Sequence, residues 1–199
     1  MDKIICVGKN YLEHAKELGD AVPEKPVLFL KPPSTLVRVD QSATVTLPRN
    51  RGQIHPECEI VGRVRLTSRG PEIDAVTLGL DMTLRDIQGQ LKKNGHPWEI
   101  SKVFSGSSMI GPWISLADFP DYLEKEFSFS VQGEIKQKGK GNQMRVLPLD
   151  CLRAAEESFP ICDGDLLFTG TPAGVGPVLS GQISELRWEN KLQYKIHWG

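Results

Sequence analysis

Two glutamates separated by a single residue, Glu57 and Glu59, lie in the run Ile54–Leu66, which alternates apolar and polar side chains. In an extended strand their carboxylates fall on one face, roughly 7 Å apart. Carboxylates this close repel unless a cation lies between them, and such hard oxygen ligands favour Mg²⁺, Mn²⁺ or Ca²⁺ over zinc. The alternative is an ordinary half-exposed strand that turns its acidic side chains to water and its apolar ones, Leu66 included, to the core.

A third carboxylate, Asp81, follows the β-rich run that starts at Val76, close to the point where the pattern turns helical. A carboxylate at the end of a strand can reach a site and complete a three-carboxylate metal centre. The alternative is that Asp81 caps the helix that follows.

His14 and Glu17 stand three residues apart in a short helical pattern, so their side chains meet on one surface. A carboxylate partner orients an imidazole and raises its basicity, which suits a general base acting on water. The alternative is a surface ion pair.

A glycine-rich stretch at 169–177 follows a strand and could present backbone N–H groups to an anion, although it lacks the Lys-Ser/Thr pair of a Walker A loop. Its alternative is a plain turn. Lys31 and Lys102 follow or lie within apolar runs, and by default such lysines extend their ammonium groups to solvent.

The elements that must position these residues are mostly strands. The helices expected are 11–18, 84–94 and 149–158. The strands expected are Ile4–Val7, Val27–Leu30, Ala43–Leu47, Glu57–Leu66, Val76–Leu84, Phe127–Val131, Leu166–Thr169 and Lys191–Trp198. Strands and helices do not alternate strictly, so we expect a mainly β (α+β) fold rather than a doubly wound parallel sheet.

Length and charge set the class of protein. The chain has 199 residues, with 24 Lys plus Arg against 25 Asp plus Glu, which predicts one domain over 1–199 and no nucleic-acid partner. No apolar run is long enough to span a membrane, and the start of the chain resembles a strand rather than a signal peptide, so we expect a cytoplasmic protein. The four cysteines show no metal-pair spacing, which favours reduced, partly buried thiols.

Taken in order, these motifs resemble the fumarylacetoacetate hydrolase family, and within it the short, single-domain acylpyruvase branch. The resemblance covers nearly the whole chain. The matching segments are Ile5–Tyr11 with His14, Pro26–Pro32, Glu57-x-Glu59, Leu80–Asp86, Gly95–Trp98 with Lys102, and Thr169–Gly176.

The resemblance implies a mixed β-roll or distorted barrel, assembled as a homodimer, that binds Mg²⁺ or Mn²⁺ and a small 2-oxo acid. The metal ligands it implies are Glu57, Glu59 and Asp81. The catalytic residues it implies are His14 and Glu17 on a lid helix, and Lys102 beside the substrate carbonyl. It places Arg85, Gln88 and Thr171 around the substrate.

The implied reaction is the hydrolysis of an acylpyruvate, a 2,4-diketo acid such as acetylpyruvate or fumarylpyruvate, to pyruvate and a carboxylic acid. His14, aided by Glu17, would activate water, while the metal and Lys102 would stabilise the enolate that forms. Oxaloacetate decarboxylation or tautomerisation, or hydration or isomerisation of a 2-oxo acid, could use the same metal site. A non-catalytic binding protein is the rival from another class.

Three positions depart from the family pattern: His55 is followed by Pro56 where many relatives have a second histidine, Lys9 replaces an arginine, and the 67–75 connection is short. These departures bear on substrate preference and on docking of the lid helix more than on metal binding.

Overall fold

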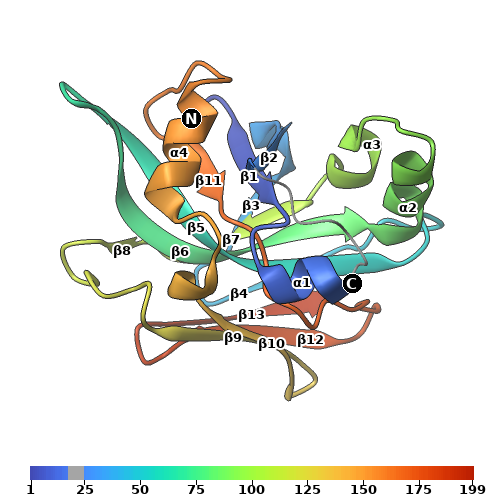
Figure 1. The fold of residues 1–199 in the computed structure, drawn as a ribbon. Coiled ribbons are helices and arrows are strands. Elements are labelled where there is room, and N and C mark those ends of the chain that lie inside the picture. Colours follow the sequence, from blue (N-terminus) through green and yellow to red (C-terminus); the bar gives the residue numbers. More distant parts are fainter. Residues whose placement is uncertain (18–24) are drawn as a thin grey trace.

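The computed structural model describes residues 1–17 and 25–199, and the side chains of all of these except His14, Ala15 and Lys16. Two sheets account for most of the described chain, and short helices lie around them (Figure 1). The mainly β expectation is therefore confirmed. None of the described helices is long and apolar enough to cross a membrane.

The larger sheet is mixed and stays open at both ends of its main path over the described strands. The short strand β8 (Ile114–Ser115) pairs with one member, β6, beside this path. In spatial order the path is β2 (Val27–Lys31), β1 (Ile4–Gly8), β11 (Leu166–Phe168), β5 (Ile54–Thr67), β6 (Gly70–Leu84), β7 (Ser108–Ile110) and β3 (Leu36–Arg38).

The smaller sheet lies below the larger one in the view of Figure 1. Its order is β10 (Glu134–Lys140), β9 (Glu126–Val131), β12 (Ile183–Trp188), β13 (Leu192–Trp198) and β4 (Ser42–Val45). The aromatic part of the core lies around Trp188 of β12, which packs in T-shaped pairs with Phe119, Tyr122 and Phe127. Tyr194 ties the two sheets together, because its hydroxyl donates to the Leu78 carbonyl of β6 at 3.0 Å.

Helices fill the remaining sides. They are α1 (Leu12–Glu17), α2 (Arg85–Lys93), α3 (Glu99–Lys102) and α4 (Pro148–Glu156), with 3₁₀ turns at Pro33–Thr35 and Gly141–Gln143. The helix α4 covers one face of the large sheet through Cys151, Leu152 and Ala155, which pack with Ile5 and Leu167. The pair α2 and α3 lies on the other side of the molecule (Figure 1).

The long hairpin β5–β6 carries the candidate site. Its register places Glu57 opposite Asp81 and Glu59 opposite Gly79. A side chain at Gly79 would approach the Met109 carbonyl within 2.6 Å, so this position requires glycine. The hairpin tip projects beyond both sheets, which explains why Leu66, expected in the core, is 45% exposed.

The buried carboxylate of Asp165 connects the start of the chain to the turn that immediately precedes β11. This carboxylate accepts hydrogen bonds from the backbone N–H groups of Asp2, Lys3 and Cys162 and from the Lys3 ammonium. Burial by itself would raise the pKa of Asp165, but these donors outweigh it and hold the pKa below its ordinary value. The ionised form is therefore part of the folded state.

Candidate metal and 2-oxo acid site

The three acidic side chains selected from the sequence meet on the β5–β6 hairpin. Glu57, Glu59 and Asp81 each offer an oxygen, and these atoms lie within 4.8 Å of one another. All three residues are buried, with exposed fractions of 7%, 2% and 1%. The interpretation of a half-exposed strand with a wet acidic face is therefore wrong, and so is the capping role for Asp81, which lies inside β6.

Two buried lysines surround Asp81. The Lys102 ammonium at the end of α3 donates to Asp81 Oδ2 at 2.6 Å, to Glu57 Oε2 at 2.7 Å and to the Thr83 hydroxyl at 2.7 Å. Lys31, at the end of β2, donates to Asp81 Oδ1 at 2.5 Å and to the Ser107 carbonyl at 2.6 Å. The expectation that both ammonium groups reach solvent is wrong, because each is satisfied inside the protein.

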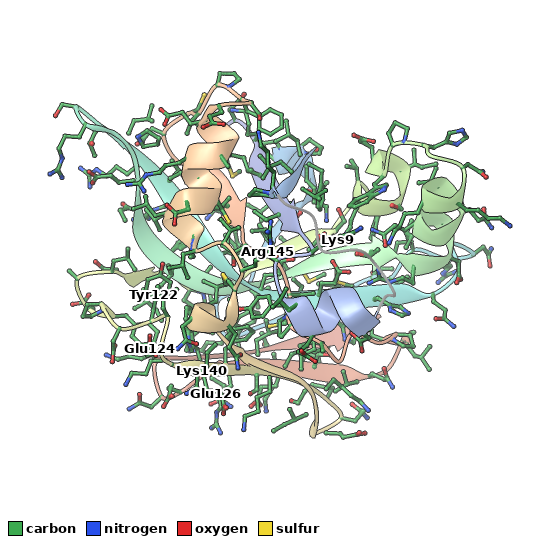
Figure 2. All side chains as sticks on the ribbon, viewed as in Figure 1. Lys9, Tyr122, Glu124, Glu126, Lys140 and Arg145 are labelled. Atoms are coloured by element: carbon green, nitrogen blue, oxygen red, sulfur yellow. The ribbon has the colours of Figure 1, made fainter. Side chains whose placement is uncertain are left out.

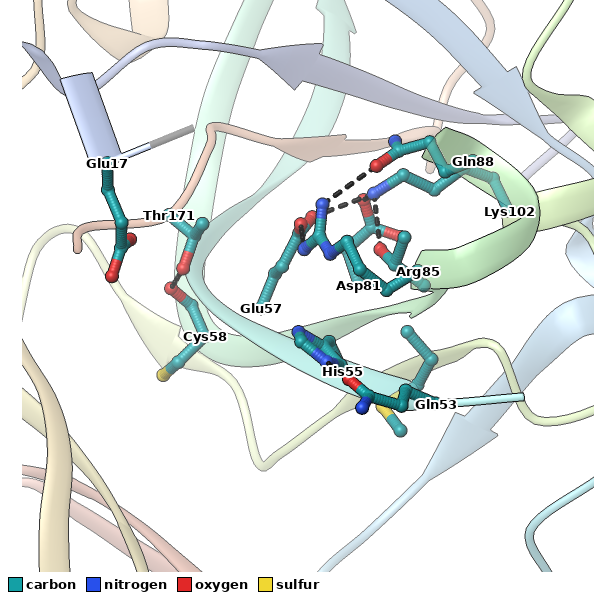
Figure 3. Close-up of polar contacts among 12 residues, drawn as sticks. Glu17, Gln53, His55, Glu57, Cys58, Asp81, Arg85, Gln88, Lys102 and Thr171 are labelled. Carbon is teal, nitrogen blue, oxygen red and sulfur yellow. Dashed lines mark hydrogen bonds and ion pairs between the residues drawn. The ribbon is translucent and has the colours of Figure 1, made fainter. Parts of the chain in front are cut away.

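The first turn of α2 closes the site on the other side of Glu57. The Arg85 guanidinium donates to Glu57 Oε1 at 2.5 Å and to Gln88 Oε1 at 2.7 Å (Figure 3). Arg85 and Gln88 meet because residues three apart share a helix face. Gln88 thereby fixes the guanidinium that orients Glu57.

The electrostatics of the triad favour a cation. Burial, reinforced by the neighbouring charges of Asp81 and Glu57, raises the pKa of Glu59 well above its ordinary value. The Gly170 backbone N–H donates to Glu59 Oε2 at 2.7 Å. The same carboxylates raise the pKa of Lys102 against the opposing effect of its burial, so its ammonium stays charged.

The donor set fits a divalent metal. Three carboxylates on rigid, paired strands offer the hard oxygen ligands that Mg²⁺ and Mn²⁺ prefer. Each carboxylate oxygen has a second lone pair, so Glu57 and Asp81 can keep their ammonium and guanidinium partners while they bind a cation. Glu57, Glu59 and Asp81 are the residues that would hold it.

The lid-helix residues are only partly described. His14 belongs to α1, but its side chain lies outside the described residues. The Glu17 carboxylate accepts a hydrogen bond from the Gly174 backbone N–H at 3.2 and 3.3 Å, so it fastens α1 to the glycine-rich loop. Gly174 has a φ of +95°, and an added Cβ would lie 1.9 Å from the Lys136 carbonyl oxygen.

Thr171 lines the cavity that contains the carboxylate triad, but its hydroxyl is hydrogen-bonded to other groups of the protein. It donates to the Cys58 carbonyl at 2.8 Å and accepts from Gln137 Nε2 at 2.7 Å. Because its single hydroxyl hydrogen is used in this way, Thr171 cannot donate a hydrogen bond to a substrate. The substrate-binding role expected for it is therefore limited to accepting a hydrogen bond or to packing.

Gln137, on β10, was missed by the sequence reasoning. Its Oε1 accepts the Cys58 N–H at 3.0 Å, and its Nε2 also donates to the Pro172 carbonyl at 2.8 Å. The strand β11 pairs with β5 only over Val61–Arg63, so the peptide groups of Cys58 lie beyond the last strand partner on this side. Gln137 and Thr171 replace that partner and hold the backbone between Glu57 and Glu59.

His55 lies two residues before Glu57, and its Nε2 is 3.0 Å from Gln53 Oε1. Burial and the nearby Arg85 guanidinium lower the pKa of His55 to about 4. The imidazole is therefore neutral at physiological pH and adds no positive charge to this side of the site.

The cavity at the triad is lined by both apolar and polar side chains. Phe29 and Trp98 meet edge to face with ring centroids 6.0 Å apart, and the Lys102 ammonium lies 5.2 Å from the Phe29 centroid. Together with the triad, the lining residues are Val7, Gly8, Lys9, Phe29, Arg85, Gln88, Lys92, Trp98, Lys102, Gly170 and Thr171. The cavity therefore offers an acidic floor beneath a rim that carries cationic side chains.

Known proteins are similar to this chain in both sequence and fold. The chain is 39% identical over 191 residues to the oxaloacetate tautomerase YcgM of Escherichia coli, covering 91% of this chain and 85% of that protein. It is 37% identical over 188 residues to a mitochondrial oxaloacetate decarboxylase of Dictyostelium discoideum, covering 91% and 86%. The fumarylpyruvate hydrolase of Pseudomonas aeruginosa, solved with Mn²⁺ and pyruvate, superposes with a TM-score of 0.86 at 30% identity, covering 98% and 88%.

A crystal structure of a fumarylacetoacetate hydrolase family protein from Yersinia pestis CO92 superposes with a TM-score of 0.90 at 33% identity, covering 100% of this chain and 94% of that one. The family profile described as "Fumarylacetoacetate (FAA) hydrolase C-terminal" matches residues 3–194. The resemblance seen in the motifs is confirmed on both grounds. The chain belongs to the fumarylacetoacetate hydrolase family of metal-dependent enzymes.

Proposed function

We propose that this chain is an oxaloacetate tautomerase or decarboxylase, which interconverts or cleaves a 2-oxo acid through its enol form. The observation that carries the proposal is the buried triad of Glu57, Glu59 and Asp81 with the Lys102 ammonium between two of its members. Relatives of the chain that carry the tautomerase or decarboxylase name support it. These relatives favour this activity over acylpyruvate hydrolysis, the main expectation from the motifs.

The side chains have complementary roles in this proposal. A divalent cation, Mg²⁺ or Mn²⁺, held by the triad would supply positive charge to the carboxylate and 2-oxo oxygens of the substrate. The Lys102 ammonium, which donates to Asp81, Glu57 and Thr83, supplies a fixed positive charge close to the oxygen on which negative charge develops, in a site where burial strengthens the interaction. Arg85, fixed by Gln88, keeps Glu57 oriented.

Proton transfer at C3 of the substrate falls to His14 in this proposal, with Glu17 as its partner. Glu17 is fastened to Gly174, which places the end of α1 beside the loop that also supplies Gly170 and Thr171. Residues 1–199 act as one catalytic domain, in keeping with a family match that spans almost the entire chain.

Acylpyruvate hydrolysis is the second candidate, because the fumarylpyruvate hydrolase neighbour combines Mn²⁺ and pyruvate with the same fold. It differs from the first in one requirement: water must be activated to attack the 4-carbonyl. The two reactions therefore differ in what His14 deprotonates, C3 of the substrate or a water molecule, and not in their use of the carboxylate triad.

The test follows two reactions in parallel with Mg²⁺, Mn²⁺ or EDTA. One is the loss of oxaloacetate enol absorbance, and the other is pyruvate release from acetylpyruvate. We expect cation-dependent ketonisation of oxaloacetate that exceeds acetylpyruvate cleavage and is lost in Glu57→Ala. Faster cleavage of acetylpyruvate would make the hydrolase the principal activity, and cation-independent rates would refute both proposals.

The variant His14→Ala tests which of these reactions depend on this base. Loss of acetylpyruvate hydrolysis with retained oxaloacetate decarboxylation would show two activities at one site. Loss of tautomerisation together with hydrolysis would support a shared base.

A further inference from the structure

The Asp81 carboxylate binds one buried ammonium group on each of its two oxygens. Lys31, the last residue of β2, donates to Oδ1 at 2.5 Å, and Lys102, the last residue of α3, donates to Oδ2 at 2.6 Å. The two lysine side chains are 0% and 3% exposed, so water has little access to replace either of them. Because a turn of the carboxylate would break both ion pairs, Asp81 is fixed in one orientation.

Ser107, which immediately precedes β7, holds both lysines in place. Its backbone carbonyl accepts hydrogen bonds from the Lys31 ammonium at 2.6 Å and from the Met82 N–H at 2.9 Å. Its hydroxyl donates to the Lys102 carbonyl at 2.8 Å, and Ser107 itself is fully buried. The two lysines are therefore anchored to the same buried residue, next to the strand that carries Asp81.

Lys31 differs from Lys102 and Arg85, the other cations paired with the triad, in that it does not reach the cavity. Lys102 and Arg85 line this cavity, whereas Lys31 is not among the described residues that line it. The Lys31 ammonium instead lies within hydrogen-bond distance of Asp81 Oδ1 and the Ser107 carbonyl. An effect of Lys31 on a ligand in the cavity must therefore pass through Asp81, which makes Lys31 a positioning residue and not a catalytic one.

A fixed carboxylate discriminates between divalent cations. Ca²⁺ takes about six to eight oxygen ligands in flexible geometry and often binds a carboxylate through both of its oxygens. Mg²⁺ is smaller, requires nearly octahedral geometry and keeps several waters, and Mn²⁺ also takes octahedral oxygen sites. An Asp81 side chain that cannot turn suits the smaller cations, because it cannot adjust to offer both oxygens to a larger one.

We propose that Lys31, by fixing Asp81, makes the metal centre selective for Mg²⁺ and Mn²⁺ over Ca²⁺. The inference rests on the proposed function only in that both take a divalent cation to bind at Glu57, Glu59 and Asp81. Without the Lys31 ammonium, Asp81 keeps its ion pair with Lys102 but can turn to present both oxygens to a larger cation. The preference among cations is the diagnostic quantity, because the loss of one positive charge strengthens the binding of all divalent cations alike and general damage weakens it for all.

The test compares the wild type with Lys31→Met, which has a side chain of similar length without the charge. Mn²⁺, Mg²⁺ and Ca²⁺ are titrated separately by calorimetry, with no substrate present. The wild type should bind Mn²⁺ and Mg²⁺ more tightly than Ca²⁺. In Lys31→Met the preference for each of the two over Ca²⁺ should fall by about 10-fold, as expected when the hydrogen-bond partner of a metal ligand is lost. Lys31→Gln, which retains an uncharged donor, should shift the preference in the same direction and replaces Lys31→Met if that variant does not fold.

Two controls separate this effect from general damage and from cations bound elsewhere. Lys3→Met removes another buried lysine from an aspartate, Asp165, which lies 3.0 Å away and outside the triad. Glu126→Gln removes a surface carboxylate on β9 of the smaller sheet (labelled in Figure 2). Both variants should keep the wild-type preference among the three cations within about 2-fold.

An unchanged preference in Lys31→Met, an equal change for all three cations, or a wild type that binds Ca²⁺ as tightly as Mn²⁺ would each overturn the inference. Oxaloacetate turnover distinguishes this failure from a failure of the proposed function. If the cation preference depends on Lys31 but oxaloacetate is not turned over, the inference stands and the proposed reaction falls. If oxaloacetate is turned over but the cation preference does not depend on Lys31, the inference alone falls.

Discussion

Replacing Gln137 by methionine should destabilise the protein by about 2–4 kcal/mol, although the two side chains have similar length. The change removes the acceptor of the Cys58 N–H and the donor to Thr171 and Pro172. An ordinary hydrogen bond contributes about 1 kcal/mol net, and a buried donor left without a partner costs about 1–3 kcal/mol. Because Gln137 is 1% exposed, water has little access to replace it.

Urea denaturation of Gln137→Met is the assay, with Gln193→Met as its control. Gln193 is exposed on β13, so its variant should stay within about 0.5 kcal/mol of the wild type. We expect a lower midpoint for Gln137→Met at an unchanged slope, which identifies a change in stability rather than in the unfolded state. A loss no larger than that of the control would refute the view that Gln137 replaces the missing strand partner of β5.

Three further changes test other parts of the structure. Lys102→Met leaves two buried carboxylates short of a partner and should lower stability by about 3–5 kcal/mol; thermal melts should show a larger gain on adding Mn²⁺ than in the wild type, and an equal gain would contradict this. The carboxylate of Asp165, with its lowered pKa, should stabilise the fold above pH ~3.9 and lose this effect as the pH falls through the folded pKa; urea unfolding at pH 6 down to pH 2 should show a shallower acid dependence for Asp165→Asn. Gly174→Ala places a Cβ against the Lys136 carbonyl and should lower the free energy of unfolding by more than about 1 kcal/mol; an unchanged urea midpoint would argue against the tight loop.

Alternation of apolar residues was sufficient to locate the long strands. Glu57–Leu66 and Val76–Leu84 lie within β5 and β6, and the helix expected at 84–94 corresponds to α2. The strands β3 and β8 escaped prediction because two or three residues are too few to show a period. The strand β10 escaped because most of its run is polar and exposed.

The burial of the acidic residues could not be read from their own strand. An alternating strand with glutamates on one face has the same pattern whether that face meets water or a cation site. The difference arises from distant residues, since Asp81 comes from the opposite strand and Lys31 and Lys102 from two other elements. The position of Asp81 near the end of a β-rich run suggested it as a third carboxylate, and the family resemblance supplied Lys102. Lys31 was expected to extend its ammonium to solvent, and nothing local marked Gln137 as part of this network.

Titration of the protein with Mn²⁺, followed by calorimetry for the wild type and Glu59→Gln, tests the central claim most directly. The substitution keeps the shape of a side chain that is 2% exposed and removes only its charge. We predict one high-affinity site in the wild type and binding at least about 10-fold weaker in the variant, with both proteins folded. Equal affinities, or no binding to a folded wild type at millimolar Mn²⁺, would contradict a metal centre at Glu57, Glu59 and Asp81.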